Sequence, residues 1–412
     1  MSVQSGPRNQ IKKPARQQCR RAFGVLTTMS AGVPRSRSRD RQKKPVKNAQ
    51  ICRFAAVIPS PGMFRAEPCC YSLPFPQETP AIVGPAGARP PFRNDIDSVS
   101  GPPMQRFNLG TTDLAVSSAV LGLMRIADLS DAAIRQLFSK AQDVGINVFD
   151  HADIYGGEAH ECERRFGAAL RLTASERGSI VIQSKCGIRP GFFDFSEDHI
   201  LQAVDRSLAA LKTDYLDLLL LHRPDTLVEP EEVARAFDRL HAAGKVRHFG
   251  VSNHTPRQID LLKTAVDQPL VANQIQLSIA HAPSVAFGLA ANMAGLEQSI
   301  DRDGEVIAYS RINRMTLQAW SPFQQGFFGG VFVGDEKNFP ELNRVLIELS
   351  SKYGLSPSAI AYAWIARHPA KIQVVLGTTS AERLGDIAPG ADITLSREDW
   401  YHLFRAAGHV LP

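Results

Sequence analysis

The chain has 412 residues, of which 44% are hydrophobic and 21% are charged, and its formal net charge is +6. These proportions are ordinary for a soluble globular protein. No apolar run reaches the roughly 18–20 residues that a membrane-spanning helix needs, so we expect no membrane partner. The length suits one large domain with an extra segment.

Residues 1–103 differ in composition from the rest of the chain. They contain 17 Lys and Arg against 5 Asp and Glu, together with 15 of the 27 prolines. Their balance is therefore +12, whereas residues 104–412 carry a balance of −6. Because the segment shows no helical or alternating periodicity and has little apolar surface to bury, we expect it to be a disordered, basic, Pro-rich tail.

Three interpretations of this tail remain open. Its Arg-rich, acid-poor character resembles an organelle transit segment. A basic tail could also bind nucleic acid through phosphates, which would be the only nucleic-acid contact we expect. The favoured interpretation is a solvated tail, or translated sequence upstream of a true start at Met104, in a cytoplasmic protein.

Cysteine usage points to a reducing compartment. Only Cys162 and Cys186 lie beyond residue 103, and no Cys or His cluster has the spacing of zinc ligands. We therefore expect no metal site.

Strand-like and helix-like patterns alternate through residues 104–412. Residues 105–124 predict a short hairpin followed by a first barrel strand. The expected strands are apolar runs rich in Val, Ile and Leu, at 117–124, 145–153, 179–185, 215–225, 246–253, 270–278, 315–322 and 372–379. The clearest amphipathic helices are expected at 131–145, 196–212, 230–244 and 356–369.

Eight strands with continuous apolar runs indicate a parallel sheet that is covered by helices on its outside. Eight is also the number that closes a barrel, so the predicted fold is α/β, a (β/α)8 TIM barrel over 104–412. The longest insertion is expected from about Ser278 to Asn313, after the sixth strand.

Polar residues stand at or just after the ends of three successive strands. Asp150 and Tyr155 follow the second strand, Lys185 ends the third and His222 ends the fourth. Barrel enzymes place their sites at this carboxyl end, whereas polar residues within the strands are expected to be expelled. Each residue alone has a structural explanation, since Asp150 could cap a turn and Lys185 or His222 could be rim residues. Their common position favours catalysis.

These residue types suit the reduction of a carbonyl. Tyrosine titrates near 10 and is a weak acid at neutral pH. An ammonium at Lys185 would lower its pKa, Asp150 would hold that ammonium, and His222 would orient the carbonyl or relay a proton.

Sequence motifs along residues 104–412 resemble those of the aldo-keto reductase superfamily. The motifs, in chain order, are VFDHADIYGG, SKCG, LHRPD, GKVRHFGVSN, NQIQLS, QAWSPFQ and VVLGTTSAERL. The motif HADIYGG resembles the corresponding motif in a bacterial branch of oxidoreductases of this superfamily. The resemblance implies a (β/α)8 barrel that binds NADPH without a Rossmann domain.

The resemblance also implies roles for individual residues. The catalytic tetrad would be Asp150, Tyr155, Lys185 and His222. The nicotinamide would be bound by Ser252, Asn253, Gln274 and Trp320, with Ser321 and Phe323 in the pyrophosphate loop. The adenosine 2′-phosphate region would include Thr378, Thr379 and Arg383, and Asp386 would lie near the adenine.

Some features depart from the family pattern or have simpler explanations. Gly377 stands where many relatives have a lysine near the 2′-phosphate. The segment Gly156–Phe166 is expected to be a little longer than in relatives, so the loop beside Tyr155 is expected to differ. Trp320 could pack in the core, Ser252 with Asn253 could turn the chain, and the pair of threonines before a short helix at Ala381 could cap it. Cys186 is expected to be a core residue rather than a reactive thiol.

The predicted function is an NADP-dependent oxidoreductase that reduces an aldehyde or ketone, with Tyr155 as general acid and NADP favoured over NAD. The alternative is a nicotinamide-binding regulatory subunit of a larger assembly. Loop phenylalanines, among them Phe192, Phe193, Phe195 and the pair Phe327 and Phe328, favour an apolar or aromatic small-molecule substrate. The sequence indicates no oligomeric state.

Overall fold

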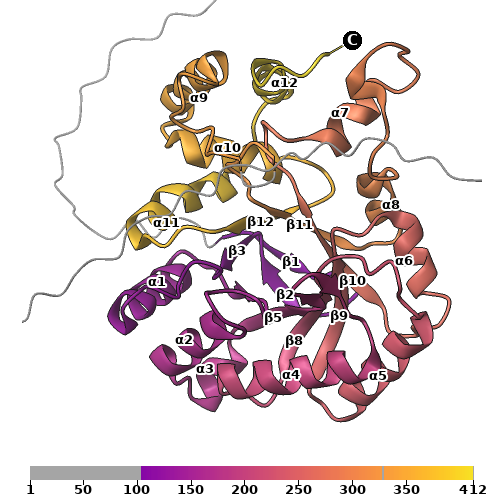
Figure 1. The fold of residues 1–412 in the computed structure, drawn as a ribbon. Helices are drawn as coiled ribbons and strands as arrows, with labels where there is room; N and C mark the ends of the chain where they lie inside the picture. The colour runs from indigo at the N-terminus through magenta and orange to yellow at the C-terminus, as the bar shows by residue number, and fades with distance from the viewer. Residues whose placement is uncertain (1–103, 327–328, 412) are drawn as a thin grey trace, which may run out of the picture. The chain divides into compact units, whose positions relative to one another are not determined.

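The computed structural model describes residues 104–411 apart from 327 and 328. The predicted tail, residues 1–103, and the phenylalanines Phe327 and Phe328 lie outside this part of the chain. Eight parallel strands close into a barrel in the order β3-β4-β5-β8-β9-β10-β11-β12, with helices around the outside (Figure 1). The predicted (β/α)8 barrel is confirmed.

The barrel strands are β3 (Ala119–Gly122), β4 (Val148–Asp150), β5 (Val181–Cys186), β8 (Leu216–Leu221), β9 (Val246–Ser252), β10 (Leu270–Gln276), β11 (Thr316–Trp320) and β12 (Gln373–Leu376). Two small antiparallel pairs lie outside the barrel sheet, β1 (Arg106–Asn108) with β2 (Ala115–Ser117), and β6 (Ile188–Arg189) with β7 (Phe192–Phe193).

The helices are α1 (Asp131–Asp143), α2 (Glu161–Leu170), α3 (Ala174–Gly178), α4 (Glu197–Leu211), α5 (Pro230–Ala242), α6 (Pro256–Leu262), α7 (Pro283–Leu289), α8 (Val306–Ile312), α9 (Pro340–Tyr353), α10 (Pro357–Ala366), α11 (Ala381–Ile387) and α12 (Arg397–Ala406). Two 3₁₀ turns complete them, η1 (Glu297–Ser299) and η2 (Ala388–Asp392). Within residues 104–411, no helix has the length and apolarity to span a membrane.

Strand β8 shows why the barrel strands are continuously apolar. Leu218 and Leu220 belong to the cluster of side chains inside the barrel, whereas Leu219 and Leu221 belong to the cluster between the barrel and the helices. Because successive side chains point to opposite faces and both faces are buried, these four positions all favour an apolar residue. Asp217, which is also buried in this strand, is compensated by two ion pairs.

The β1–β2 hairpin covers one end of the barrel. Leu109 and Val116 pack with the interior valines Val120 and Val148 of the first two barrel strands. The backbone N–H of Gly110 donates a 2.8 Å hydrogen bond to Thr316 Oγ1 at the start of β11. The hairpin therefore closes the amino-terminal end of the strands and leaves their carboxyl-terminal end uncovered.

The four clearest predicted helices are confirmed as α1, α4, α5 and α10. Within the segment 156–166, helix α2 begins at Glu161, and the expected extra length of this segment stays a prediction. The predicted insertion 278–313 contains α7, η1 and α8, of which α8 directly precedes strand β11.

Helices α2 and α4 approach each other closely at Gly167. A Cβ atom built there would meet the carbonyl oxygen of Ala210 and lie 2.8 Å from that of Leu211. Since both contacts are with backbone, a side chain at Gly167 would push the two helices apart.

We expect Gly167→Ala to lower the free energy of unfolding by about 1–3 kcal/mol, the usual cost of overpacking. Denaturant unfolding followed by circular dichroism measures this loss. Gly178→Ala is the matched control, because a Cβ there meets no atom within 4 Å. Equal stability of the two variants would contradict the close contact.

Candidate active site

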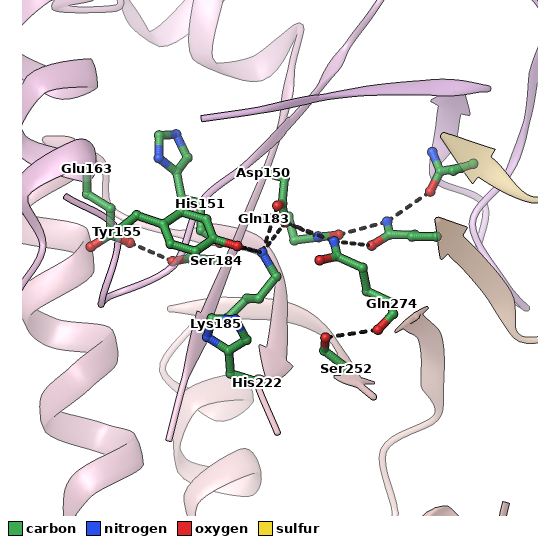
Figure 2. Close-up of polar contacts among 12 residues, drawn as sticks. Asp150, His151, Tyr155, Glu163, Gln183, Ser184, Lys185, His222, Ser252 and Gln274 are labelled. Carbon is green, nitrogen blue, oxygen red and sulfur yellow. Dashed lines mark hydrogen bonds and ion pairs between the residues drawn. The ribbon is translucent and has the colours of Figure 1, made fainter. Parts of the chain in front are cut away.

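Three neighbouring strands bring the predicted catalytic residues to the carboxyl end of the barrel. Asp150 is the last residue of β4, Lys185 lies near the end of β5, and His222 follows β8. Asp150 pairs in register with Gln183, so strand alternation puts Gln183 and Lys185 on the same face as each other. Figure 2 shows the amine of Lys185 between Asp150 and the hydroxyl of Tyr155.

The ammonium of Lys185 has four oxygen atoms within hydrogen-bond distance, which its three N–H groups share. Its Nζ lies 2.6 and 2.7 Å from the two carboxylate oxygens of Asp150 and 2.8 Å from the carbonyl oxygen of His151. It also donates to Tyr155 OH at 3.0 Å. The side chains of Lys185 and Asp150 are 0% and 3% exposed, so this ion pair is buried and fully hydrogen-bonded.

The electrostatics of the pair differ in part from the expectation. Burial disfavours the charged form of Lys185, but attraction to Asp150 and contact with Tyr155 raise its pKa above the usual value. The pKa of Tyr155 is also raised, because removal of the phenol from water outweighs the opposing effect of Lys185. The predicted net lowering of the Tyr155 pKa is therefore wrong, although Lys185 acts in the predicted direction.

His222 approaches Tyr155 edge-on, with the ring centroids 5.9 Å apart and the planes at 82°. Its Nδ1 is buried without a hydrogen-bond partner among the described residues. Burial, with the positive charges of Lys185 and Arg223, lowers the pKa of His222 well below its usual value. The imidazole is therefore neutral at physiological pH and suits a hydrogen-bonding role.

A second polar cluster, which the sequence did not predict, lies behind Tyr155. Glu163 of α2 accepts hydrogen bonds of 2.6 Å from Ser184 Oγ and from His160 Nδ1. Burial and repulsion by Glu163 raise the pKa of Asp153 to about 7. The sequence did contain a signal for this cluster, because Glu163 falls on the buried face of α2. A buried charge requires hydrogen-bonding partners, so polar neighbours could have been expected there.

Cys186 behaves as expected of a core residue. It is 2% exposed, and burial raises the pKa of its thiol well above the usual value. The thiol is therefore not activated by its neighbour Lys185.

The barrel interior contradicts the expectation that polar residues are expelled from the strands. Gln183, Gln274, Gln318 and Gln373 are each at most 3% exposed and hydrogen-bond to one another across the interior. They are retained because each amide finds polar partners. A glutamine within an otherwise apolar strand was the signal in the sequence.

Four of the predicted nicotinamide-binding residues are joined in one hydrogen-bonded group. Trp320 Nε1 donates to Asn253 Oδ1 at 2.9 Å, and Asn253 Nδ2 donates to Ser252 Oγ at 2.8 Å. Ser252 Oγ donates to the carbonyl oxygen of Gln274 at 2.9 Å. Asn253 has a φ of 60°, so it also turns the chain after β9, and the two interpretations of this residue are compatible.

The remaining predicted cofactor residues follow the last two strands. Ser321 and Phe323 lie directly after β11, and Thr378 and Thr379 lie between β12 and α11. The helix α11 is capped by Ser380, which accepts from the backbone N–H of Arg383 at 3.2 Å. The simpler alternative, that the threonines cap this helix, is therefore wrong.

Helix α11 carries two more of these residues on its surface. Arg383 and Asp386 are exposed, and the side chain of Arg383 makes no hydrogen bond or ion pair within residues 104–411. Arg125, which the sequence did not single out, donates from Nε to the carbonyl oxygen of Gly377 at 3.1 Å. A positive charge thus lies over Gly377, where many relatives are expected to have a lysine.

The described residues fit a polar, anionic cofactor. Gln276 at the end of β10 holds a buried amide nitrogen without a partner among the described residues, and the exposed guanidinium of Arg383 forms no ion pair with them. Such groups are the donors that carbonyl and phosphate oxygens require.

Comparisons with known proteins agree with this geometry. The model of the Aldo/keto reductase family matches residues 119–406. The uncharacterized oxidoreductase YcsN of Bacillus subtilis is 36% identical over 75% of this chain and 100% of its own length. A 6-dehydroglucose reductase of Agrobacterium fabrum is 35% identical over 74% of this chain and 98% of its own length.

Solved structures show the same relationship. The thermostable aldo-keto reductase Tm1743, solved with the inhibitor epalrestat, superposes with a TM-score of 0.58 at 25% identity. The match covers 74% of this chain and 100% of that one. With a barrel of this order and an Asp–Lys–Tyr group at its carboxyl end, the chain belongs to the aldo/keto reductase family of oxidoreductases.

Proposed function

We propose that this protein is an NADPH-dependent reductase that converts an aldehyde or ketone to an alcohol, with Tyr155 as general acid. The observation that carries the proposal is the 3.0 Å hydrogen bond from Lys185 Nζ to Tyr155 OH, with Asp150 holding the ammonium on its other side. A phenol in contact with a fixed ammonium can release a proton to a nearby oxygen.

The residues of this chain would handle the proton. A reduced nicotinamide, when bound, supplies the hydride that adds to the carbonyl carbon. The electron pair of the C=O π bond moves to oxygen, and Tyr155 transfers its phenolic proton there, so a neutral alcohol forms. Lys185 stabilises the remaining phenolate until it is reprotonated from solvent. The neutral imidazole of His222 orients the carbonyl by a hydrogen bond.

The preference for NADP over NAD rests on exposed positive charge. Arg383 presents a guanidinium at α11 that has no ion-pair partner in the part of the chain that the structure describes, and Arg125 lies over Gly377, directly after β12. Guanidinium groups bind phosphate in a charge-assisted, bidentate manner, so these residues suit the additional phosphate that distinguishes NADP.

Two substrate classes enter the proposal. The name of the Agrobacterium relative supports a sugar-derived carbonyl. The sequence favoured an apolar carbonyl because of loop phenylalanines, but Phe195 is 2% exposed and packs in the core. Phe192 and Phe193, by contrast, are exposed on the β6–β7 hairpin. The name of the relative puts sugar-derived carbonyls first in our proposal. The exposed Phe192 and Phe193 keep aromatic aldehydes as the second class to be tested.

Replacement of Tyr155 by Phe is expected to lower kcat by about 10²–10⁴-fold, the usual contribution of general acid catalysis. The change leaves the ring in place, so the dissociation constant for NADPH, from fluorescence quenching, should stay within about twofold. Absorbance at 340 nm over aldehydes, ketones and sugars measures turnover, and retained turnover would defeat the role of Tyr155. A wild-type chain that binds NADPH but reduces none of them would favour the regulatory-subunit alternative, which otherwise stays a prediction.

Replacement of Arg383 by Ala is expected to weaken NADPH binding by about 10-fold, as for one lost charge-assisted hydrogen bond, and to leave NADH binding unchanged. Titration of each cofactor by fluorescence gives the two dissociation constants. Arg405→Ala, at an exposed arginine in α12, serves as the control for a lost surface charge. Equal effects on the two cofactors would contradict a role in phosphate recognition.

The rate of reduction is expected to fall as the pH rises through about 7, because the pKa of Asp153 is raised to about 7 by burial and by Glu163. Ionised Asp153 adds negative charge near Tyr155, which disfavours the phenolate and slows proton transfer. A pH profile of kcat measures this fall in rate. Asp153→Asn should remove it, and an unchanged profile in that variant would refute the assignment.

A further inference from the structure

Strand register brings amides from both sides of the barrel together beneath the catalytic pair. Gln274, Gln318 and Gln373 are successive register partners on β10, β11 and β12. On the opposite side, Gln183 of β5 is the register partner of Asp150. Because the barrel is closed, side chains that point inward from these strands meet in its interior.

The hydrogen bonds among these side chains form a closed loop that includes the catalytic carboxylate. Gln274 Nε2 donates to Asp150 Oδ1 at 3.2 Å and to Gln318 Oε1 at 3.1 Å. Gln318 Nε2 donates to Gln183 Oε1 at 2.9 Å, and Gln183 Nε2 returns to Asp150 Oδ1. Figure 2 shows Gln183 and Gln274 on the same side of Asp150.

The loop is anchored at a point that is distant from the reaction. Gln318 Nε2 also donates to Gln373 Oε1 at 2.9 Å, and Gln373 Nε2 donates to the carbonyl oxygen of Ser117 at 2.7 Å. Ser117 ends the hairpin strand β2. The network therefore runs from the closed end of the barrel to the carboxylate of Asp150.

Each amide orientation in the network is determined by its neighbours. Gln318 uses both N–H groups as donors and its oxygen as an acceptor. If its amide were flipped, its nitrogen would meet the donating nitrogen of Gln274, and its oxygen would meet two acceptor oxygens. Gln274 has both N–H groups committed inward, which leaves its Oε1 for a ligand. Buried amides that lack partners are strongly disfavoured, so the network resists rearrangement.

We propose that Gln183, Gln318 and Gln373 are positioning residues for the reaction proposed above. Their hydrogen-bonded amides fix the carboxylate of Asp150, which in turn holds the ammonium of Lys185 against the phenol. The N–H groups that point at Asp150 also compensate part of its negative charge, and this favours the phenolate. The inference rests on the proposed function for its kinetic consequences alone.

The test is the ionisation of Tyr155 in Gln183→Met, a variant that keeps the length of the side chain and removes the donor to Asp150. We expect the midpoint of Tyr155 ionisation to move up by roughly 0.5–1 pH unit, because the less compensated carboxylate disfavours the phenolate. Ultraviolet difference titration measures it, with Tyr155→Phe subtracted. Leu218→Met, at the register partner of Gln183, is the control and should cause no shift.

Gln373→Met provides a second variant in case the first does not fold. Among the described residues the side chain of Gln373 hydrogen-bonds only Gln318 and Ser117, so any effect on Tyr155 must pass through the network. We expect a smaller upward shift. If both variants unfold at the same temperature as Leu218→Met and neither shifts the ionisation of Tyr155, the positioning role is overturned.

Turnover in the same samples separates this inference from the proposed function. We expect kcat to fall about 5–10-fold in Gln183→Met, with KM within about twofold. If the ionisation of Tyr155 shifts in Gln183→Met but the wild-type protein reduces no carbonyl, the proposed function is refuted and the positioning role is supported. Normal reduction with an unshifted phenol would refute the positioning role alone.

Discussion

The buried ion pair between Asp150 and Lys185 is the interaction on which the rest of the site depends. Two charges removed from water are costly, and the loss of one partner from such a pair typically costs about 3–5 kcal/mol. Here the cost is offset by short hydrogen bonds from Lys185 to both carboxylate oxygens and to a backbone carbonyl. The ammonium also contacts the hydroxyl of Tyr155, and this contact joins the ion pair to the group that we propose as the general acid.

The closed barrel makes this arrangement possible. Parallel strands in fixed register deliver Asp150, Lys185 and His222 to one rim, while the β1–β2 hairpin closes the other end. Inside the barrel a polar layer replaces the usual branched apolar side chains, and it supports Asp150 from below. Rigid elements thus hold the groups that we propose to be catalytic, and loops remain free to set substrate and cofactor preference.

The fold follows from the sequence, since continuous apolar strands such as 215–225 and the polar residues that end three of them are local signals. The same signals predicted the group of Asp150, Lys185 and Tyr155 that the closed barrel brings together, whose catalytic role stays a proposal. The interior amides do not follow, because the pairing of Gln274 with Gln318 depends on strand register, which no local pattern fixes. Arg125 was missed for a similar reason, since it meets Gly377 only after the barrel closes. The direction of the Tyr155 pKa was misjudged because desolvation depends on packing, which composition does not reveal.

The most direct measurement of the central claim is the charge of Lys185. Its side-chain ¹⁵N resonance, assigned by its absence from Lys185→Met, can be followed from about pH 6 to 11. The account predicts an ammonium shift that persists to higher pH than for exposed lysines, which titrate near 10.4. A neutral amine signal at about pH 8 would contradict it, because Tyr155 would then have no positive charge beside it.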